Sequence, residues 1–198
     1  MRNETRNRIL DSALRLFSAE GYTEVTTKAI ANTAGVNEVT IFRHFGKKRD
    51  LYIEVYKTFA KQPSPDLLLG RVEYDLEKDL KLIGSIIADL VHSNFRIVTM
   101  SFKAVEKEIR EISDQLKKQM DDIGVHIQPY FVSMKERKKI SGDPEELAFL
   151  FTDMVFSLVI HRLRRGNTAT LSEDVEKLSV IFARGITLPG RTVEARNK

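Results

Sequence analysis

Apolar residues recur at helical spacing along most of the chain. They form one stripe over residues 5–20, and Gly21 follows where a left-handed helix end is expected. Thr26 or Thr27 is suited to cap a short helix, and Gly35-Val36-Asn37 then predicts a turn whose Asn37 caps a helix over 38–45. After Gly46 a longer helix is predicted over 48–61.

The first prolines, in Gln62-Pro63-Ser64-Pro65, predict a break between this front segment and the rest. Beyond it, helices are expected over 75–93, 106–134 with a bend at Pro129, 144–165 capped by Asp143, and 172–185. The stretch 95–102 fits a strand or a buried helix, but a single strand would have no partner, so a helix is expected. The predicted fold class is all-α.

Composition narrows the function classes. The 198 residues are 42% hydrophobic and 30% charged, the balance of a globular protein with a real core. The absence of cysteine excludes disulfide scaffolds, thiol catalysis and cysteine-ligated metals. The most apolar segment, 147–160, contains Asp153 and is too short to span a bilayer, so a cytoplasmic protein with no membrane partner is expected.

Positive charge is concentrated at the front of the chain. The net charge is +4, and residues 1–50 carry nine basic against six acidic side chains. A compact basic module suits a polyanionic partner, although chance asymmetry of a solvated surface gives the same count.

The two short helices joined by Ala34-Gly35-Val36-Asn37 have the spacing of a helix-turn-helix. In that motif the first helix braces the second, whose N-terminal side chains enter a major groove. Arg43 is the side chain best able to contact guanine with two hydrogen bonds, while Thr40 and Val39 suit a thymine methyl or a phosphate. Basic residues at 47–49 open the next helix, where free backbone N–H groups also favour phosphate.

Residues 5–56 resemble the DNA-binding region of the TetR (tetracycline-repressor) family. The resemblance is carried, in order, by the strings Ile9-Leu10-Asp11-Ser12-Ala13-Leu14-Arg15-Leu16-Phe17, Gly21-Tyr22, Thr26-Thr27-Lys28-Ala29-Ile30-Ala31, Ala34-Gly35-Val36 and Thr40-Ile41-Phe42-Arg43-His44-Phe45, with Lys48 and Leu51. Three positions depart from the family pattern. Phe42 replaces the usual tyrosine, Lys47 replaces a capping Ser or Asn, and Glu38 places a carboxylate at the head of the recognition helix.

The resemblance implies a homodimeric transcriptional regulator, often a repressor, that is released from a palindromic operator by a small molecule. The residues expected to contact the double-stranded DNA operator are Thr26, Thr27, Lys28, Asn37, Glu38, Val39, Thr40, Phe42, Arg43, His44, Lys47 and Lys48. Two alternatives stay open: a helical ligand-binding protein whose basic front end binds another polyanion, and a helix-turn-helix that serves protein contacts.

No catalytic or metal motif is found. The four histidines lack metal-ligand spacing, and glycine-rich phosphate loops, Gly-x-Ser-x-Gly and His-Glu-x-x-His are all missing from the sequence. We therefore expect no enzyme activity, no metal and no cofactor.

The segment 144–165 is apolar around nearly its whole circumference, which predicts burial by its own domain and by a second subunit. The expected homodimer interface comprises Phe156, Val159, Ile160, Leu163, Leu178 and Phe182. Asp153, Ser157 and His161 lie at i, i+4 and i+8, and either a ligand-facing stripe or a solvent or interface seam explains them.

The resemblance also implies an effector pocket in the C-terminal domain. Because no cluster of Arg or Lys interrupts the apolar faces there, a largely apolar, neutral or cationic small molecule is the expected ligand. The expected walls of the pocket are Phe95, Met100, Met120, Ile123, Ile127, Phe131 and Asp153. The same apolar stripe is also what a solid core requires. The predicted organisation is a DNA-binding domain over 1–50, a helical effector and dimerisation domain over 51–190, and a flexible tail over 191–198.

Overall fold

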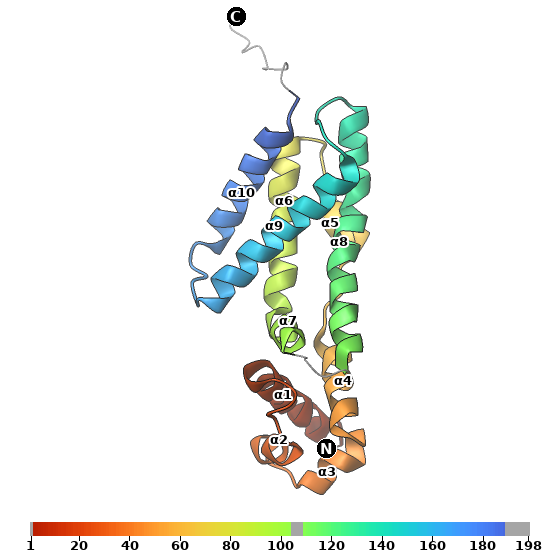
Figure 1. The fold of residues 1–198 in the computed structure, drawn as a ribbon, viewed down its shortest axis with the longest axis vertical. Coiled ribbons are helices and arrows are strands. Elements are labelled where there is room, and N and C mark those ends of the chain that lie inside the picture. Colours follow the sequence, from red (N-terminus) through yellow and green to blue (C-terminus); the bar gives the residue numbers. More distant parts are fainter. Residues whose placement is uncertain (1, 104–108, 189–198) are drawn as a thin grey trace, which may run out of the picture. The chain divides into compact units, whose positions relative to one another are not determined.

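The computed structural model describes residues 2–103 and 109–188, and in those residues every regular element is a helix (Figure 1). The all-α prediction is therefore confirmed. The helices are α1 (Arg2–Glu20), α2 (Thr27–Ala34), α3 (Glu38–Phe45), α4 (Lys48–Phe59), α5 (Pro65–Leu69), α6 (Leu76–Ser93), α7 (Phe95–Phe102), α8 (Arg110–Glu136), α9 (Pro144–Arg164) and α10 (Leu171–Ile186).

The chain forms two compact units. The first unit contains the described parts of residues 1–62 and 93–119, and the second contains those of 63–92 and 120–198. The first unit thus extends past the expected boundary at residue 50, because Leu51, Tyr52 and Val55 of α4 are fully buried where α4 packs on α1. The predicted tail, 191–198, lies outside the described residues.

In the first unit, α1 is the central helix and contacts α2, α4 and α7. Its apolar stripe buries Ile9, Leu10 and Phe17 completely. The ring of Phe17 lies edge-on to that of Tyr52, with centroids 5.0 Å apart. Gly21 ends α1 with φ = +92°, as its position in the sequence predicts.

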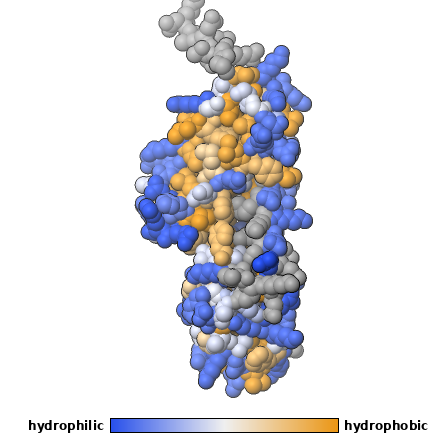
Figure 2. Space-filling view, viewed as in Figure 1, coloured by the Kyte–Doolittle hydropathy of each residue, from blue (hydrophilic) through white to orange (hydrophobic). Residues whose placement is uncertain are grey.

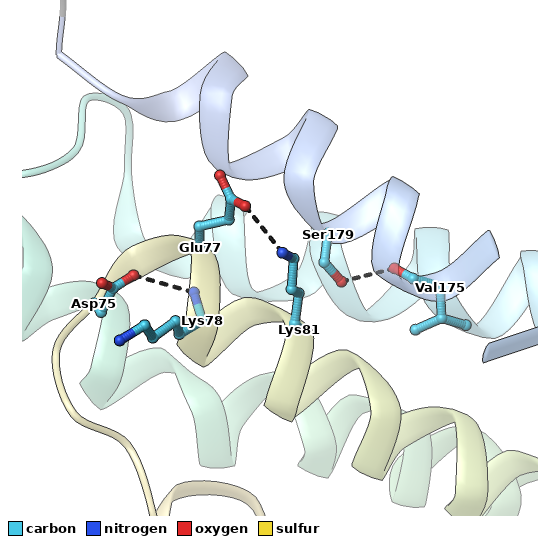
Figure 3. Close-up of polar contacts among 6 residues, drawn as sticks. All are labelled: Asp75, Glu77, Lys78, Lys81, Val175 and Ser179. Carbon is cyan, nitrogen blue, oxygen red and sulfur yellow. Dashed lines mark hydrogen bonds and ion pairs between the residues drawn. The ribbon is translucent and has the colours of Figure 1, made fainter. Parts of the chain in front are cut away.

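The second unit packs α6, α9 and α10 closely enough to require a glycine. A Cβ at Gly84 of α6 would lie 2.7 Å from the hydroxyl oxygen of Ser179 and 3.3 Å from Val175, both on α10. The Ser179 hydroxyl donates to the Val175 carbonyl, 2.9 Å away, so it is satisfied within its own helix (Figure 3). Fully buried Phe151 of α9 also lies next to Gly84.

A buried carboxylate fixes the turn that precedes α6. Asp79 is only 2% exposed, and its two oxygens accept from the Tyr130 hydroxyl at 3.0 Å and from the backbone N–H of Glu73 at 2.8 Å. Burial and the neighbouring Asp79 raise the pKa of Tyr130 well above its ordinary value. Tyr130 therefore stays a neutral donor to Asp79.

Beyond α4 the structure confirms the predicted helix over 95–102 and the predicted cap of α9, and it adds one short helix. At the predicted break of Pro63–Pro65, the short helix α5 begins at Pro65 and is capped by the Ser64 side chain. The stretch 95–102 is helical, and Asp143 caps α9 by accepting from the N–H groups of Glu145 and Glu146. The predicted start of the helix at 106 lies outside the described residues.

Candidate DNA-binding surface

The turn between α2 and α3 is held by its capping residues. The Thr26 side chain accepts from the N–H of Ala29 at 3.0 Å and opens α2. Gly35 adopts φ = +64° and ψ = +41°, the left-handed conformation that costs a glycine least. Asn37 then accepts from the N–H of Val39 at 3.0 Å and opens α3. These contacts fix where α3 starts and the direction it takes.

A small apolar contact and one hydrogen bond join α2 to α3. Ile30, Ala31, Ala34 and Ile41 are buried, as the helix-turn-helix reading requires. In addition, the Thr27 hydroxyl donates to the Glu38 carboxylate, with the two oxygens 2.6 Å apart. Glu38 and Thr27, both expected at the DNA, are thus already bonded to each other.

The opposite face of α3 is open to solvent and carries apolar side chains. Val39 is 71% exposed and Phe42 is 48% exposed, and both lie on a helix whose inward-facing Ile41 is buried. Arg43 is exposed beside them, while Thr40 and His44 are half-buried. An eight-residue helix with this outward face offers the major groove one guanidinium and two apolar surfaces.

Basic side chains border this face at the start of α4. Lys47 is exposed, and its N–H donates to the Asp50 carboxylate at 3.3 Å. The Lys48 ammonium lies 4.3 Å from the centre of the Tyr22 ring and donates to the Thr23 carbonyl at 3.4 Å. Lys28 is exposed on α2. These three cations are of the type that contacts phosphate oxygens.

The sequence reasoning missed the bonds that brace this region from residues 94–103. The Asn94 side chain accepts from the Lys61 N–H at 2.8 Å and donates to the Lys61 carbonyl at 2.9 Å. The Tyr52 hydroxyl donates to the Met100 carbonyl at 3.0 Å, and the Lys103 ammonium donates to the carbonyls of Ser18 and Ala19. These partners are 33 to 85 residues apart, and no local pattern marks them.

The residues expected to wall an effector pocket are divided between the two units. Phe95 and Met100 belong to the first unit, and Ile123, Ile127, Phe131 and Asp153 belong to the second. Met100, Ile123, Ile127 and Phe131 are buried, whereas Asp153 is exposed on α9. The side chain of Met120 lies outside the described residues.

The residues expected at a dimer interface also fall into two groups. Phe156, Ile160, Leu163 and Leu178 are half-buried and accessible on α9 and α10. Val159 and Phe182 were expected to face a partner, but they belong to the chain's own core, where Val159 is completely buried. The correction follows from the wheel of α9, on which Val159 shares the inward face with Val155 and Phe151.

A capped helix–turn–helix with an open second helix defines the class of protein as a DNA-binding regulator. Residues 9–55 match the family described as bacterial regulatory proteins, tetR family. The chain is 31% identical over 194 residues to an uncharacterized HTH-type transcriptional regulator, YvkB, of Bacillus subtilis (strain 168), covering 92% of this chain and 97% of that protein. The chain therefore belongs to the tetR family of transcriptional regulators.

Two further relatives cover different parts of the chain. The HTH-type transcriptional regulator AcrR of Shigella flexneri is 46% identical over 54 residues, which are 27% of this chain and 25% of that one. The crystal structure of NalD, the secondary repressor of the MexAB-OprM multidrug efflux pump in Pseudomonas aeruginosa, superposes with a TM-score of 0.73. It is 22% identical and spans 95% of this chain and 98% of that chain, which shows the shared fold.

Within residues 2–103 and 109–188, no helix is both long enough and apolar enough to cross a membrane.

Proposed function

We propose that this regulator binds a palindromic operator as a homodimer, represses transcription, and is released by a small, largely apolar effector. The observation that carries the proposal is the open face of α3, where Val39, Phe42 and Arg43 project from a helix fixed at both its start and its inner face. In a major groove, exposed apolar side chains are complementary to thymine methyl groups, and an adjacent arginine is complementary to the two acceptors of guanine.

The proposed contacts divide by chemistry. Arg43, Thr40, Val39 and Phe42 read base edges, and His44 lies at the margin of the same face. Residues placed at helix starts or carrying positive charge contact phosphate: Thr26, Lys28, Asn37, Lys47 and Lys48.

Thr27 and Glu38 have a different proposed role. Their hydrogen bond of 2.6 Å engages the Glu38 carboxylate within the protein, so we assign the pair to positioning α3. Positioning supports affinity for every operator sequence, whereas base contacts support the choice among sequences.

The homodimer follows from the half-buried apolar residues of α9 and α10. Phe156, Ile160, Leu163 and Leu178 remain accessible after the chain has folded. Two-fold symmetry would place two copies of α3 on one duplex, so the operator is an inverted repeat.

Two arguments support repression and effector release: the similar fold of a known repressor, and the apolar character of the residues expected to wall the pocket. NalD, of similar fold, is named as the repressor of a multidrug efflux pump. In this chain the expected wall residues that are buried in the second unit, Ile123, Ile127 and Phe131, are all apolar, which suits a largely apolar ligand. The effector works only if it prefers the DNA-incompetent state, and a coupling of about 1–3 kcal/mol weakens operator binding about 5–150-fold.

The test is capture of genomic DNA fragments by the purified full chain, followed by footprinting to base resolution. The proposal predicts an inverted repeat upstream of a gene and lower reporter transcription when the protein is present. Equal retention of shuffled fragments would contradict sequence-specific binding, and higher transcription would contradict repression.

Effector release is tested separately. Compounds that raise the melting temperature of the protein are then added to the operator complex. At least one is expected to lower operator affinity. If every stabilising compound left that affinity unchanged, the effector part of the proposal would be wrong.

A further inference from the structure

The outward face of α9 carries a line of polar side chains with apolar side chains on both sides. The face opposite buried Phe151, Val155 and Val159 carries Leu150, which is 52% exposed, together with the exposed side chains of Asp153, Ser157, His161 and Arg164. Half-buried apolar residues flank this line on both sides, among them Met154 and Ile160. Figure 2 shows hydrophobic residues gathered on the visible face of this unit between hydrophilic margins.

Charge is divided between the two ends of this helix. The first turn of α9 carries Glu145 and Glu146, and Asp153 is the next acidic residue. The last turn carries His161, Arg162 and Arg164, with Arg165 directly after it. Arg162 is already paired with Asp174 at 2.7 Å, which leaves the exposed Arg164 and Arg165 to define the basic end.

A second copy of α9 fits this arrangement only in the antiparallel direction. Antiparallel pairing lays the acidic end of each helix on the basic end of the other, whereas parallel pairing opposes like charges and costs free energy at both ends. Two-fold symmetry makes such a contact self-complementary. A residue that precedes the axis by a given number of positions on one helix faces the residue that follows the axis by the same number on the other helix.

The position of the axis follows from the polar line. Asp153 and His161 are each four residues from Ser157, so an axis at Ser157 brings each Asp153 to the His161 of the second copy. A small side chain at the crossing lets the two helices approach closely, and Ser157 is the smallest residue on the line.

A surface hollow lies beside this crossing. It is lined by six residues of α9: Phe156, Ser157, Ile160, His161, Arg164 and Arg165. Side chains of an opposing helix would fill such a hollow as ridges fill grooves.

We propose that α9 pairs antiparallel with α9 of a second copy of this chain, with Ser157 on the two-fold axis and Asp153 against the partner copy's His161. The inference rests on the homodimer of the proposed function and adds its register. It also assigns the polar line to the interface, in place of a ligand-facing stripe.

The test uses the absence of native cysteine. Ser157→Cys introduces one thiol per chain, and a disulfide needs the two Cβ atoms within about 4.5 Å of each other. An axis at Ser157 predicts that mild oxidation converts most of the full-length variant to covalent dimer. Ser85→Cys, at an exposed serine of α6, is the matched control and should stay uncoupled.

A second set of variants tests the direction of pairing. Asp153→Cys combined with His161→Cys should cross-link, while each single variant should not, because its symmetry mate lies on the far side of the axis. Asp153→Arg alone should weaken dimerisation about tenfold or more, and His161→Glu added to it should restore the dimer by giving the introduced arginine an oppositely charged partner.

The outcomes separate the register from the homodimer itself. A wild-type chain that sediments as a dimer while Ser157→Cys cross-links no better than Ser85→Cys overturns the proposed register and leaves the homodimer standing. A wild-type chain that sediments as a monomer at micromolar concentration overturns both. Sequence-specific DNA binding is measured separately and is not decided by either result.

Discussion

The Thr27 hydroxyl on α2 donates to the Glu38 carboxylate at the first residue of α3, across 2.6 Å. Together with buried Ile41, this bond sets the angle at which α3 leaves the turn. The negative charge of Glu38 would repel a phosphate backbone. In this structure its carboxylate instead accepts a hydrogen bond from Thr27 within the protein.

Replacing Thr27 by Val keeps the shape of the side chain and removes the donor. We expect operator affinity to fall by about 1–2 kcal/mol for all operator sequences alike, because a hydrogen bond to a charged group is lost while no base contact changes. Thr27→Ser keeps the hydroxyl and should bind like the wild type. Binding to a panel of singly mutated operators checks this, and a changed base preference in Thr27→Val would show that Thr27 acts on the bases.

Replacing Arg43 and replacing Lys48 by alanine are expected to change DNA binding in different ways. Arg43→Ala should cost about 1–3 kcal/mol and relax base preference at one position of each half-site. Lys48→Ala should weaken all sequences alike and lower the salt dependence, the slope of log K against log salt, by about 1 per subunit. Binding measured at several salt concentrations distinguishes them, and the opposite pattern would reverse the two assignments.

The exposed pair Val39 and Phe42 is expected to contact thymine methyl groups. Replacing thymine by deoxyuridine removes only that methyl, so affinity should fall at one or two operator positions. The loss should disappear in Val39→Ala or Phe42→Ala, since the methyl then has no apolar partner. Phe42→Tyr is the matched control, because it keeps the ring. Equal losses in the wild type and both alanine variants would show that these side chains do not contact the methyl.

The pKa of Tyr130 predicts a change in stability at high pH. Burial and Asp79 raise this pKa in the folded chain, so between roughly pH 10 and the higher folded pKa the unfolded state has lost a proton that the folded state keeps. The unfolding free energy should therefore fall by up to about 1.4 kcal/mol per pH unit more in the wild type than in Tyr130→Phe.

The same variant should be less stable at neutral pH. Tyr130→Phe leaves Asp79 without one of its two donors and should cost about 1–3 kcal/mol. Denaturant unfolding across the pH range measures both effects. Parallel curves above pH 10 would mean that Tyr130 ionises alike in both states.

Local signals predicted the DNA-binding unit well. Thr26, Gly35 and Asn37 specify a cap, a left-handed turn and a second cap through interactions within a few residues, and the structure places each as expected. Tertiary contacts were harder to predict. Asn94 bonds to Lys61, and Tyr52 bonds to Met100, across distances in sequence that no periodicity encodes.

The sequence also did not show which face of α9 is buried and which is exposed. A helix apolar on most sides gives no contrast from which to choose its buried face, so Val159 was assigned to a partner although it lies in the core. The polar line of Asp153, Ser157 and His161 was visible in the sequence, and only the exposure of all three shows that it faces outward.

The central claim is that α3 reads a defined DNA sequence. The most direct measurement is the ratio of dissociation constants of the full chain for a shuffled duplex and for its footprinted operator, at one physiological salt concentration. We predict a ratio of about 10³ or more, with protection of two inverted half-sites whose major grooves lie on one face of the duplex. A ratio near one, unchanged by Arg43→Ala, would contradict the account.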